Sequence, residues 1–148
     1  MSAITKLIDR IRQAKADLIA NREAEVLRIA LDQLALTKLR IQTKGQAHTG
    51  SAFAPYVPAY AKSRGKAGYQ TQFVDFTRTG RLWANIAPVI VDSGIFAATV
   101  QVTARDQRGK DILKGAERKR GNIVRPSEAE IELTRKANRE RIKKYLKI

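Results

Sequence analysis

The fold is decided by the stretch Ala84-Asn85-Ile86-Ala87-Pro88-Val89-Ile90-Val91-Asp92-Ser93-Gly94-Ile95-Phe96-Ala97-Ala98-Thr99-Val100-Gln101-Val102-Thr103. Isoleucine, valine and threonine occur in both halves of this stretch, and such β-branched residues favour strands. The halves are separated by Asp92-Ser93-Gly94, which suits a hairpin turn with its left-handed position on Gly94. Pro88 lacks an amide donor, so its strand lies at an edge or carries a bulge. The sequence therefore predicts an antiparallel hairpin over about residues 84–103.

Two strands are only marginally stable by themselves, so the hairpin needs helices, further strands or another copy of the chain to cover it. Apolar residues recur at three- and four-residue spacing over residues 1–43, and no Gly or Pro occurs before Gly45. Ser2 is a suitable N-cap. The polar segment at Asn21 leaves two alternatives, one long helix that can bend there or two separate helices. We favour the long helix. A helix of this length cannot be buried in so small a domain, so it should protrude or pack on a neighbouring subunit.

A second helix is predicted after Pro126, over about residues 128–146. Ser127 and Glu130 have the spacing of a capping box, in which each side chain bonds the backbone N–H of the other residue. Acidic residues lie in the first turn and basic residues in the last, which complements the helix dipole. These elements predict an α+β fold in one domain of four parts: a helix at 1–43, an extended arm at 44–79, a hairpin and basic loop at 80–125, and a C-terminal helix at 126–148.

The segment 44–79 is predicted to be an extended arm because glycines and prolines interrupt every helical pattern in it. Most of the aromatic residues of the chain gather here: Phe53, Tyr56, Tyr60, Tyr69, Phe73 and Phe76. A loop of this length is uncommon unless it is functional or lies on a partner. Two interpretations stay open: the aromatic side chains pin the arm to its own core, or they form a subunit interface with a neighbouring copy.

The chain is strongly basic, with 29 Lys and Arg against 14 Asp and Glu and a formal net charge of +15. Positive charge is densest in residues 105–125, where glycines recur at six-residue intervals, and we expect an exposed loop around a short turn at Ile112 and Leu113. The candidate surface for DNA or an acidic partner consists of Arg105, Arg108, Lys110, Lys114, Arg118, Lys119, Arg120 and Arg125. Such a surface contacts a polyanion, docks on an acidic protein, or keeps the chain soluble by repulsion.

Composition excludes several classes of site. Without cysteine the chain has no disulfide, thiolate zinc site or cysteine nucleophile, and its single histidine, His48, has no catalytic partner nearby in sequence. No phosphate-binding glycine motif occurs, and Asp75 is expected to be solvated or to act as a cap. No apolar run is long enough to span a membrane, and no signal peptide is recognisable. We therefore expect a protein that is not an enzyme, uses no cofactor or metal ion, and works in a cytoplasm or in something assembled there.

The order of short motifs is more informative than composition. The motifs are Phe53-Ala54-Pro55-Tyr56, Tyr60-Ala61-Lys62-Ser63-Arg64-Gly65-Lys66-Ala67-Gly68, Val74-Asp75-Phe76-Thr77-Arg78-Thr79-Gly80-Arg81-Leu82-Trp83-Ala84-Asn85-Ile86, the basic segment 115–121, and Arg125-Pro126 before the last helix. This order resembles the neck proteins of tailed bacteriophages, the tail completion or virion morphogenesis group, over about residues 53–146. The family's Thr-Gly-x-Leu turn would here consist of Thr79, Gly80, Leu82 and Trp83. Gly80 permits a tight turn and Thr79 can cap the short helix that follows.

The resemblance implies a structural virion protein of the head–tail junction, assembled in the host bacterial cytoplasm as a hexameric or dodecameric ring through which double-stranded DNA passes. Its partners would be further copies of itself, neighbouring neck, portal-adaptor or tail proteins, and DNA phosphates contacted without sequence readout. Two other classes are left open. A basic nucleic-acid-binding protein of ribosomal type would be monomeric away from its RNA. A metal-dependent nuclease would need an acidic site, and acids are scarce between residues 44 and 104.

Overall fold

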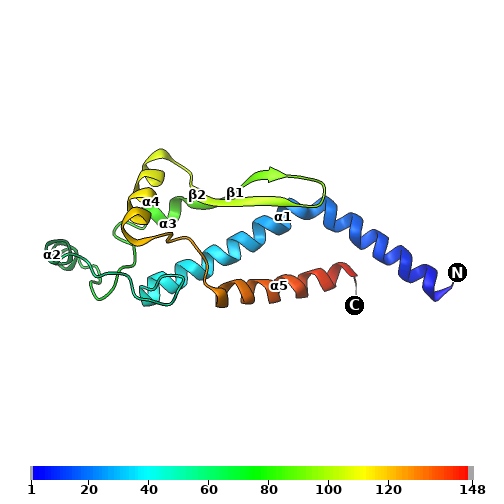
Figure 1. Ribbon diagram of the computed structural model, residues 1–148, viewed down its shortest axis with the longest axis horizontal. Coiled ribbons are helices and arrows are strands. Elements are labelled where there is room, and N and C mark those ends of the chain that lie inside the picture. Colours follow the sequence, from blue (N-terminus) through cyan, green and yellow to red (C-terminus); the bar gives the residue numbers. More distant parts are fainter. Residues whose placement is uncertain (1, 147–148) are drawn as a thin grey trace.

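The computed structural model describes residues 2–146 and has the α+β fold that the sequence predicts. Its elements are α1 (Ala3–Lys44), α2 (Pro58–Lys66), α3 (Arg81–Asn85), β1 (Ile86–Ser93), β2 (Ala98–Ala104), α4 (Gln107–Arg120) and α5 (Glu128–Leu146). The molecule is elongated, with α2 at one end and the first turns of α1 at the other (Figure 1). Residues 1, 147 and 148 of the predicted helical ends lie outside the described residues.

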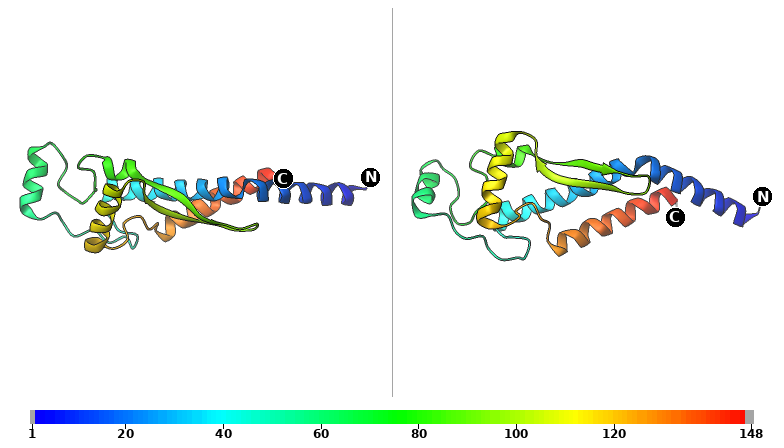
Figure 2. Two further views of the ribbon diagram at one scale, coloured as in Figure 1. Left: turned by 90° about the horizontal axis from the view of Figure 1, so that it is seen from above. Right: turned by 45° about the horizontal axis from the view of Figure 1, so that its top comes forward.

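The first helix, α1, is continuous over 42 residues and about 63 Å long at about 1.5 Å per residue. The Ser2 hydroxyl caps it by accepting a hydrogen bond from the Thr5 N–H at 3.2 Å. The helix runs through Asn21 and bends where the hairpin tip reaches it (Figure 1, Figure 2). Near this bend the Asn21 side chain donates to the Asp17 carbonyl at 2.8 Å, in competition with a helical N–H. The prediction of one long helix is confirmed.

The hairpin is antiparallel, as predicted, but its turn lies further along the chain. The register slips between Ile90 and Asp92, so Val91 forms a bulge and β1 continues to Ser93. The turn therefore occupies residues 94–97, closed by a hydrogen bond from the Gly94 N–H to the Ala97 carbonyl at 2.8 Å. Gly94 does not have a positive φ, so its predicted left-handed conformation was wrong. The register is the reason, because the pairing of Ile86 with Ala104 and of Ile90 with Val100 already centres the hairpin near residue 95, past the Asp-Ser-Gly sequence.

Side chains on α1 hold the hairpin tip. The Arg22 Nε donates to the Gly94 carbonyl at 2.6 Å, and the Ser93 hydroxyl donates to Glu23 Oε1 at 2.5 Å. The hairpin and α5 lie on opposite sides of α1 (Figure 1 and the right view of Figure 2). The long helix is thus the central element that both pack against.

The hydrophobic core lies at the end of the hairpin far from its turn, where α1, α3 and α4 meet. Its buried members are Ile41, Leu82, Trp83, Ile86, Leu113 and Ile123. Phe53 and Phe76 from the arm pack against this cluster. The core is therefore small and concentrated at one end of α1, which leaves the other end of that helix without cover.

Residues 105–125 are mainly helical, so the predicted basic loop was wrong. The 14-residue helix α4 occupies most of this segment, and Leu113 anchors it in the core. Gly109 and Gly115, whose presence suggested breaks, both lie inside the helix. A glycine costs a helix only about 1 kcal/mol relative to alanine, and burial of Leu113 contributes more than that.

The arm also contains a helix that the sequence analysis did not predict. Pro58 begins α2, in the first helical position, where a missing N–H costs nothing. The helix ends at Lys66, and Gly68 follows with a φ of +77°. The prediction of an arm without regular structure was wrong for these nine residues because Pro58 starts a helix there instead of breaking one.

Candidate docking surfaces

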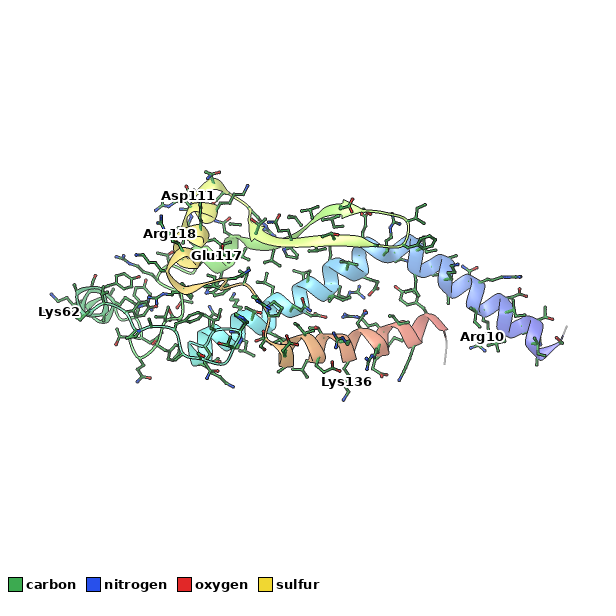
Figure 3. All side chains as sticks on the ribbon, in the orientation of Figure 1. Arg10, Lys62, Asp111, Glu117, Arg118 and Lys136 are labelled. Carbon is green, nitrogen blue, oxygen red and sulfur yellow. The ribbon has the colours of Figure 1, made fainter. Side chains whose placement is uncertain are left out.

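The eight basic residues of the candidate surface lie on α4 and directly beside it. Seven are exposed, among them Arg118, which projects from the helix in Figure 3. Arg120 is half-buried because its Nη1 donates to the Ala54 carbonyl at 2.7 Å. Arg120 therefore ties the arm to α4, and the other seven basic side chains reach solvent.

Helical spacing divides these charges between faces. Lys110 and Lys114 are four residues apart and lie on one face of α4, on the side of β2. Arg108 and Lys119 are separated by about three full turns and share a different face. The positive charge therefore surrounds the exposed part of α4 and can be contacted from more than one direction.

The orientation of α4 is set by its first turn. The Asp106 carboxylate accepts from the Gly109 N–H at 2.6 Å and from the Asn85 side chain at 2.9 Å. Both hydrogen bonds lower the pKa of the Asp106 carboxyl below its ordinary value, and the bond from the Gly109 N–H has the larger effect. Gly109 packs so closely that a Cβ there would lie 2.9 Å from the Ala104 Cβ. The missing side chain lets α4 rest directly on the start of the hairpin.

Three phenylalanines hold the arm against the rest of its own chain. Phe53 and Phe76 pack edge to face, with ring centroids 5.5 Å apart, on the core. Phe73 covers Gly45, where a Cβ would lie 2.6 Å from the Phe73 Cβ. Gly45 also needs its left-handed φ of +60° to end α1. The first interpretation of the arm is therefore correct for these residues, and their contact with a second copy stays a prediction.

The three tyrosines of the arm surround the buried Arg64 of α2. Its guanidinium carbon lies 4.7 Å from the centroid of the Tyr56 ring, 5.4 Å from that of Tyr69 and 6.0 Å from that of Tyr60. Only 1% of Arg64 is exposed, so these cation–π contacts are shielded from water. The tyrosines thus form a cage around a cation of their own chain, and Tyr69 is the most exposed of them.

Asp75 completes this cluster, which we call the Arg64 cage. Its carboxylate accepts from Arg64 Nη2 at 3.0 Å, from Gln70 Nε2 at 2.7 Å and from the Tyr56 hydroxyl at 3.0 Å. Burial alone would raise the pKa of Asp75, but these bonds and those from Thr77 outweigh it and lower the pKa. Asp75 is thus a buried anion and not the solvated or capping residue that we expected.

The predicted Thr-Gly turn is present and opens α3. Gly80 has a φ of +66° and stands at the N-cap position. The Thr79 hydroxyl accepts from the Arg81 N–H at 3.4 Å, which is a long, weak version of the predicted cap. The turn brings Leu82 and Trp83 into the core. The contacts of this turn within the chain are thus structural.

A second buried cluster, which we call the Arg40 joint, fastens α5 to α1. Arg40 Nε donates to Glu130 Oε1 at 2.7 Å, and the Thr37 hydroxyl donates to Glu130 Oε2 at 3.1 Å. Glu130 also accepts from the Ser127 N–H at 2.8 Å, while its own N–H donates to the Ser127 hydroxyl at 3.3 Å. The predicted capping box is therefore confirmed. Arg40 further donates to the Arg125 carbonyl at 3.1 Å, which fixes the chain before the helix.

Apolar side chains are left uncovered on two neighbouring parts of the molecule. The protruding start of α1 exposes Ile4, Leu7, Ile8 and Ile11, which we call the α1 stripe, each by 43% to 71%. The hairpin tip exposes Ile95 and Phe96 by 68% and 79%. The chain exposes 9989 Å² in all, whereas about 7,500 Å² is typical of a compact monomer of this mass. This apolar surface is the kind that a partner covers.

Other kinds of site find no support within the described residues. In residues 2–146 no group of His, Asp and Glu side chains is arranged to hold a metal ion. None of the helices in that range is both long and apolar enough to cross a bilayer. A scan against protein-family models and searches of curated proteins and solved structures found no match for this chain.

Sequence reasoning missed both buried ion pairs. Arg64 stands between Ser63 and Gly65, and Arg40 is one of many charged residues along a long predicted helix, so neither position gives a sign of burial. Asp75 did carry a signal, because it is the only acid between residues 44 and 80 and stands between Val74 and Phe76. A single acid with apolar neighbours in a basic segment indicates a buried partner for one of the surrounding cations.

Proposed function

We propose that this chain is a structural subunit of the head–tail junction of a tailed bacteriophage, a neck or tail completion protein. Copies of it form a hexameric or dodecameric ring through which double-stranded DNA passes. The phage assignment rests on the order of motifs from Phe53 to the last helix, which resembles that family. The proposal includes the location of the protein, which is a virion assembled in the host cytoplasm. It also includes the proteins next to the ring, which are portal-adaptor, neck or tail proteins.

The observation that carries the oligomeric part of the proposal is the α1 stripe. Its four apolar side chains recur at positions i, i+3, i+4 and i+7, the pattern of a helix face that packs on another surface. Nothing in residues 2–146 covers them, and the chain exposes about 2,500 Å² more than a compact monomer would. Contacts between copies would bury this surface, and a ring gives every copy the same contacts.

The DNA part of the proposal is supported by the exposed charge on and beside α4. Seven exposed basic side chains accompany only the acids Asp106, Asp111 and Glu117. Contacts of Lys and Arg with phosphates are independent of base sequence, as a passage for any DNA requires. A catalytic function has no comparable support, because no cluster of candidate metal ligands accompanies this charge within residues 2–146.

The ring is tested by native mass spectrometry and negative-stain electron microscopy of the purified full chain. We expect closed rings, and we expect L7E together with I11E to leave monomers with unchanged helical content by circular dichroism. The matched control, A16E together with A20E, adds the same charge to exposed positions on the opposite face of α1 and should keep the rings.

Three outcomes contradict the proposal in whole or in part. A wild-type chain that is monomeric at every concentration and binds RNA would instead be a basic protein of ribosomal type. Rings that survive the stripe variant would show that the stripe is not the contact between copies. Rings of the expected size without any DNA affinity would remove the DNA passage from the proposal while keeping the oligomer.

A further inference from the structure

A groove of about 640 Å³ runs between β2 and α4. Four consecutive residues of β2, 100–103, form one wall. Side chains alternate between the two faces of a strand, so a groove on one face would be lined by every second residue only. The groove therefore follows the edge of β2. The opposite wall is one face of α4, with Lys110, Leu113, Lys114 and Glu117. The connection between α4 and α5 closes the groove with Asn122, Val124, Arg125 and Pro126.

The backbone of β2 has unpaired groups along this groove. The sheet has two strands, so each strand has one free edge. The Arg105 N–H donates to the Asn85 carbonyl at 2.9 Å, which makes these two residues a hydrogen-bonded pair. Bonded and non-bonded pairs alternate along an antiparallel ladder, so the pairs of Val102 and Val100 with β1 are non-bonded. The N–H and C=O groups of these two valines therefore point to the free edge.

The two free edges of the hairpin are not equivalent. Val102 pairs with Pro88 in β1, and this pair is also non-bonded, so the backbone nitrogen of Pro88 faces the free edge of β1. Proline has no N–H to offer there. Proline at an outward position blunts an edge against further pairing. The edge of β2 has no proline, and within residues 2–146 no other element bonds to the backbone of Val100 or Val102. The edge of β2 is therefore the one available for another strand.

We propose that an extended, acidic polypeptide segment of a partner protein binds in this groove as an added strand on β2. Its backbone would pair with Val100 and Val102, as in other complexes formed by strand addition. Its acidic side chains would lie beside Lys110, Lys114 and Arg125, since these three cations face one acid, Glu117, in the lining. Its apolar side chains would contact Leu113 and Val124. This interaction needs neither the proposed ring nor the DNA passage, and it takes Lys110, Lys114 and Arg125 out of the set that would contact DNA.

The same features argue against DNA as the occupant. A strand edge offers alternating donors and acceptors, and phosphate oxygens can satisfy only the donors. The exposed carbonyl oxygens would repel a phosphate backbone, whereas a polypeptide supplies N–H groups to them. This restriction does not apply to the exposed basic residues outside the groove, and they remain the candidates for DNA: Arg105, Arg108, Arg118 and Lys119.

The test uses the full chain and a labelled peptide of seven residues, the length of β2, with alternating Glu and Val. Fluorescence anisotropy should show binding that a peptide with Lys in place of Glu lacks. Strand addition uses every second amide, so N-methylation of one alternate set of peptide amides should abolish binding, while the other set tolerates it. Bound peptide should also slow hydrogen exchange at the amides of Val100 and Val102.

The protein variant K110E with K114E should weaken peptide binding at least about tenfold, because it reverses the charges that face the acidic side chains. The matched control, R108E with K119E, makes the same change on the other face of α4 and should bind the peptide like wild type. No peptide binding up to about 1 mM overturns the proposal. It is also overturned if both N-methylated peptides bind equally well, or if a DNA duplex competes fully with the peptide, since the groove would then be a general polyanion site.

Discussion

Arg64 and Asp75 form an ion pair inside the arm, with Arg64 Nη2 at 3.0 Å from Asp75 Oδ1 and 3.2 Å from Oδ2. The two side chains are 1% and 6% exposed. The pair joins α2 to the chain just before α3, and the Trp83 indole N–H donates to the Asp75 carbonyl at 3.0 Å. A segment that would otherwise be a long unanchored loop is thereby connected to the hydrophobic core.

D75N should destabilise the protein by about 3 kcal/mol, because it leaves the Arg64 charge buried without a counter-ion. The measurement is urea unfolding at neutral pH, followed by tryptophan fluorescence, since Trp83 touches the site. The control is D92N, the same change at an exposed position of β1, which should shift the unfolding free energy by less than about 0.5 kcal/mol. Equal effects of both changes would show that the pair does not stabilise the arm.

Acid should weaken the protein through Asp75 and Glu130. Burial alone would raise both pKa values, but hydrogen bonds from Thr77 and Gln70 to Asp75, and from Arg40 and Ser127 to Glu130, lower them. The unfolded chain therefore takes up protons at a higher pH than the folded one. The stability from both carboxylates is complete above about pH 5 and is lost as pH falls through the folded pKa values.

Urea midpoints measured between about pH 7 and pH 3 test this dependence. The double variant D75N with E130Q should be less stable at neutral pH and should lose less stability on acidification than wild type. If wild type and variant lose the same amount, other carboxylates cause the acid sensitivity.

The C-terminal helix was predictable because its signals are local. Ser127 and Glu130 are three residues apart, and their reciprocal bonds begin α5 at the predicted residue. The contact of Glu130 with Arg40 lies 90 residues away along the chain, and no spacing rule indicates it. Local capping could therefore be predicted from sequence, whereas the packing of α5 on α1 could not.

Separate substitutions of Ser127 and Glu130 should distinguish the stability that comes from the capping bonds from the stability that comes from the ion pair with Arg40. S127A removes one capping bond and should cost about 1 kcal/mol. E130A removes the other capping bond and also leaves Arg40 buried without its partner, so it should cost about 3 kcal/mol or more. Urea unfolding measures both values, and equal losses would mean that the ion pair adds nothing to the cap.

The basic helix α4 was missed because its glycines weaken a helix locally, while the contacts that hold it are distant. Gly109 rests on Ala104 and Asn85, and Leu113 lies in the core. The bulge at Val91 was missed for a similar reason, since the turn residues at 92–94 match a tight hairpin by themselves. The α1 stripe, by contrast, follows from helical spacing alone, and its exposure agrees with the expectation that α1 protrudes.

The two glycines of α4 should respond oppositely to alanine. G109A places a Cβ 2.9 Å from the Ala104 Cβ and 3.3 Å from the Asn85 Cβ, so crowding should destabilise the protein by about 1–3 kcal/mol. G115A meets nothing within 4 Å and should stabilise it by up to about 1 kcal/mol through helix propensity. Thermal unfolding followed by circular dichroism gives both values. A stabilising G109A would show that α4 does not rest on the hairpin as described.

The charges of α4 that lie outside the groove should determine how DNA binding depends on salt. If they bind DNA phosphates, log affinity should fall linearly with log salt, and the slope should become shallower by about 0.9 for every phosphate that a variant no longer neutralises. R118Q with K119Q removes two exposed charges, so the slope should fall by up to about 1.8, with no preference for any DNA sequence. Arg120 is left unchanged, because its bond to the Ala54 carbonyl holds the arm.

The control K136Q with R139Q removes the same charge from exposed positions of α5 and should change the slope less. Fluorescence anisotropy with a DNA duplex at several salt concentrations gives these slopes. Equal slopes for the two variants would mean that DNA responds to the net charge of the chain, and α4 would then not be its contact surface.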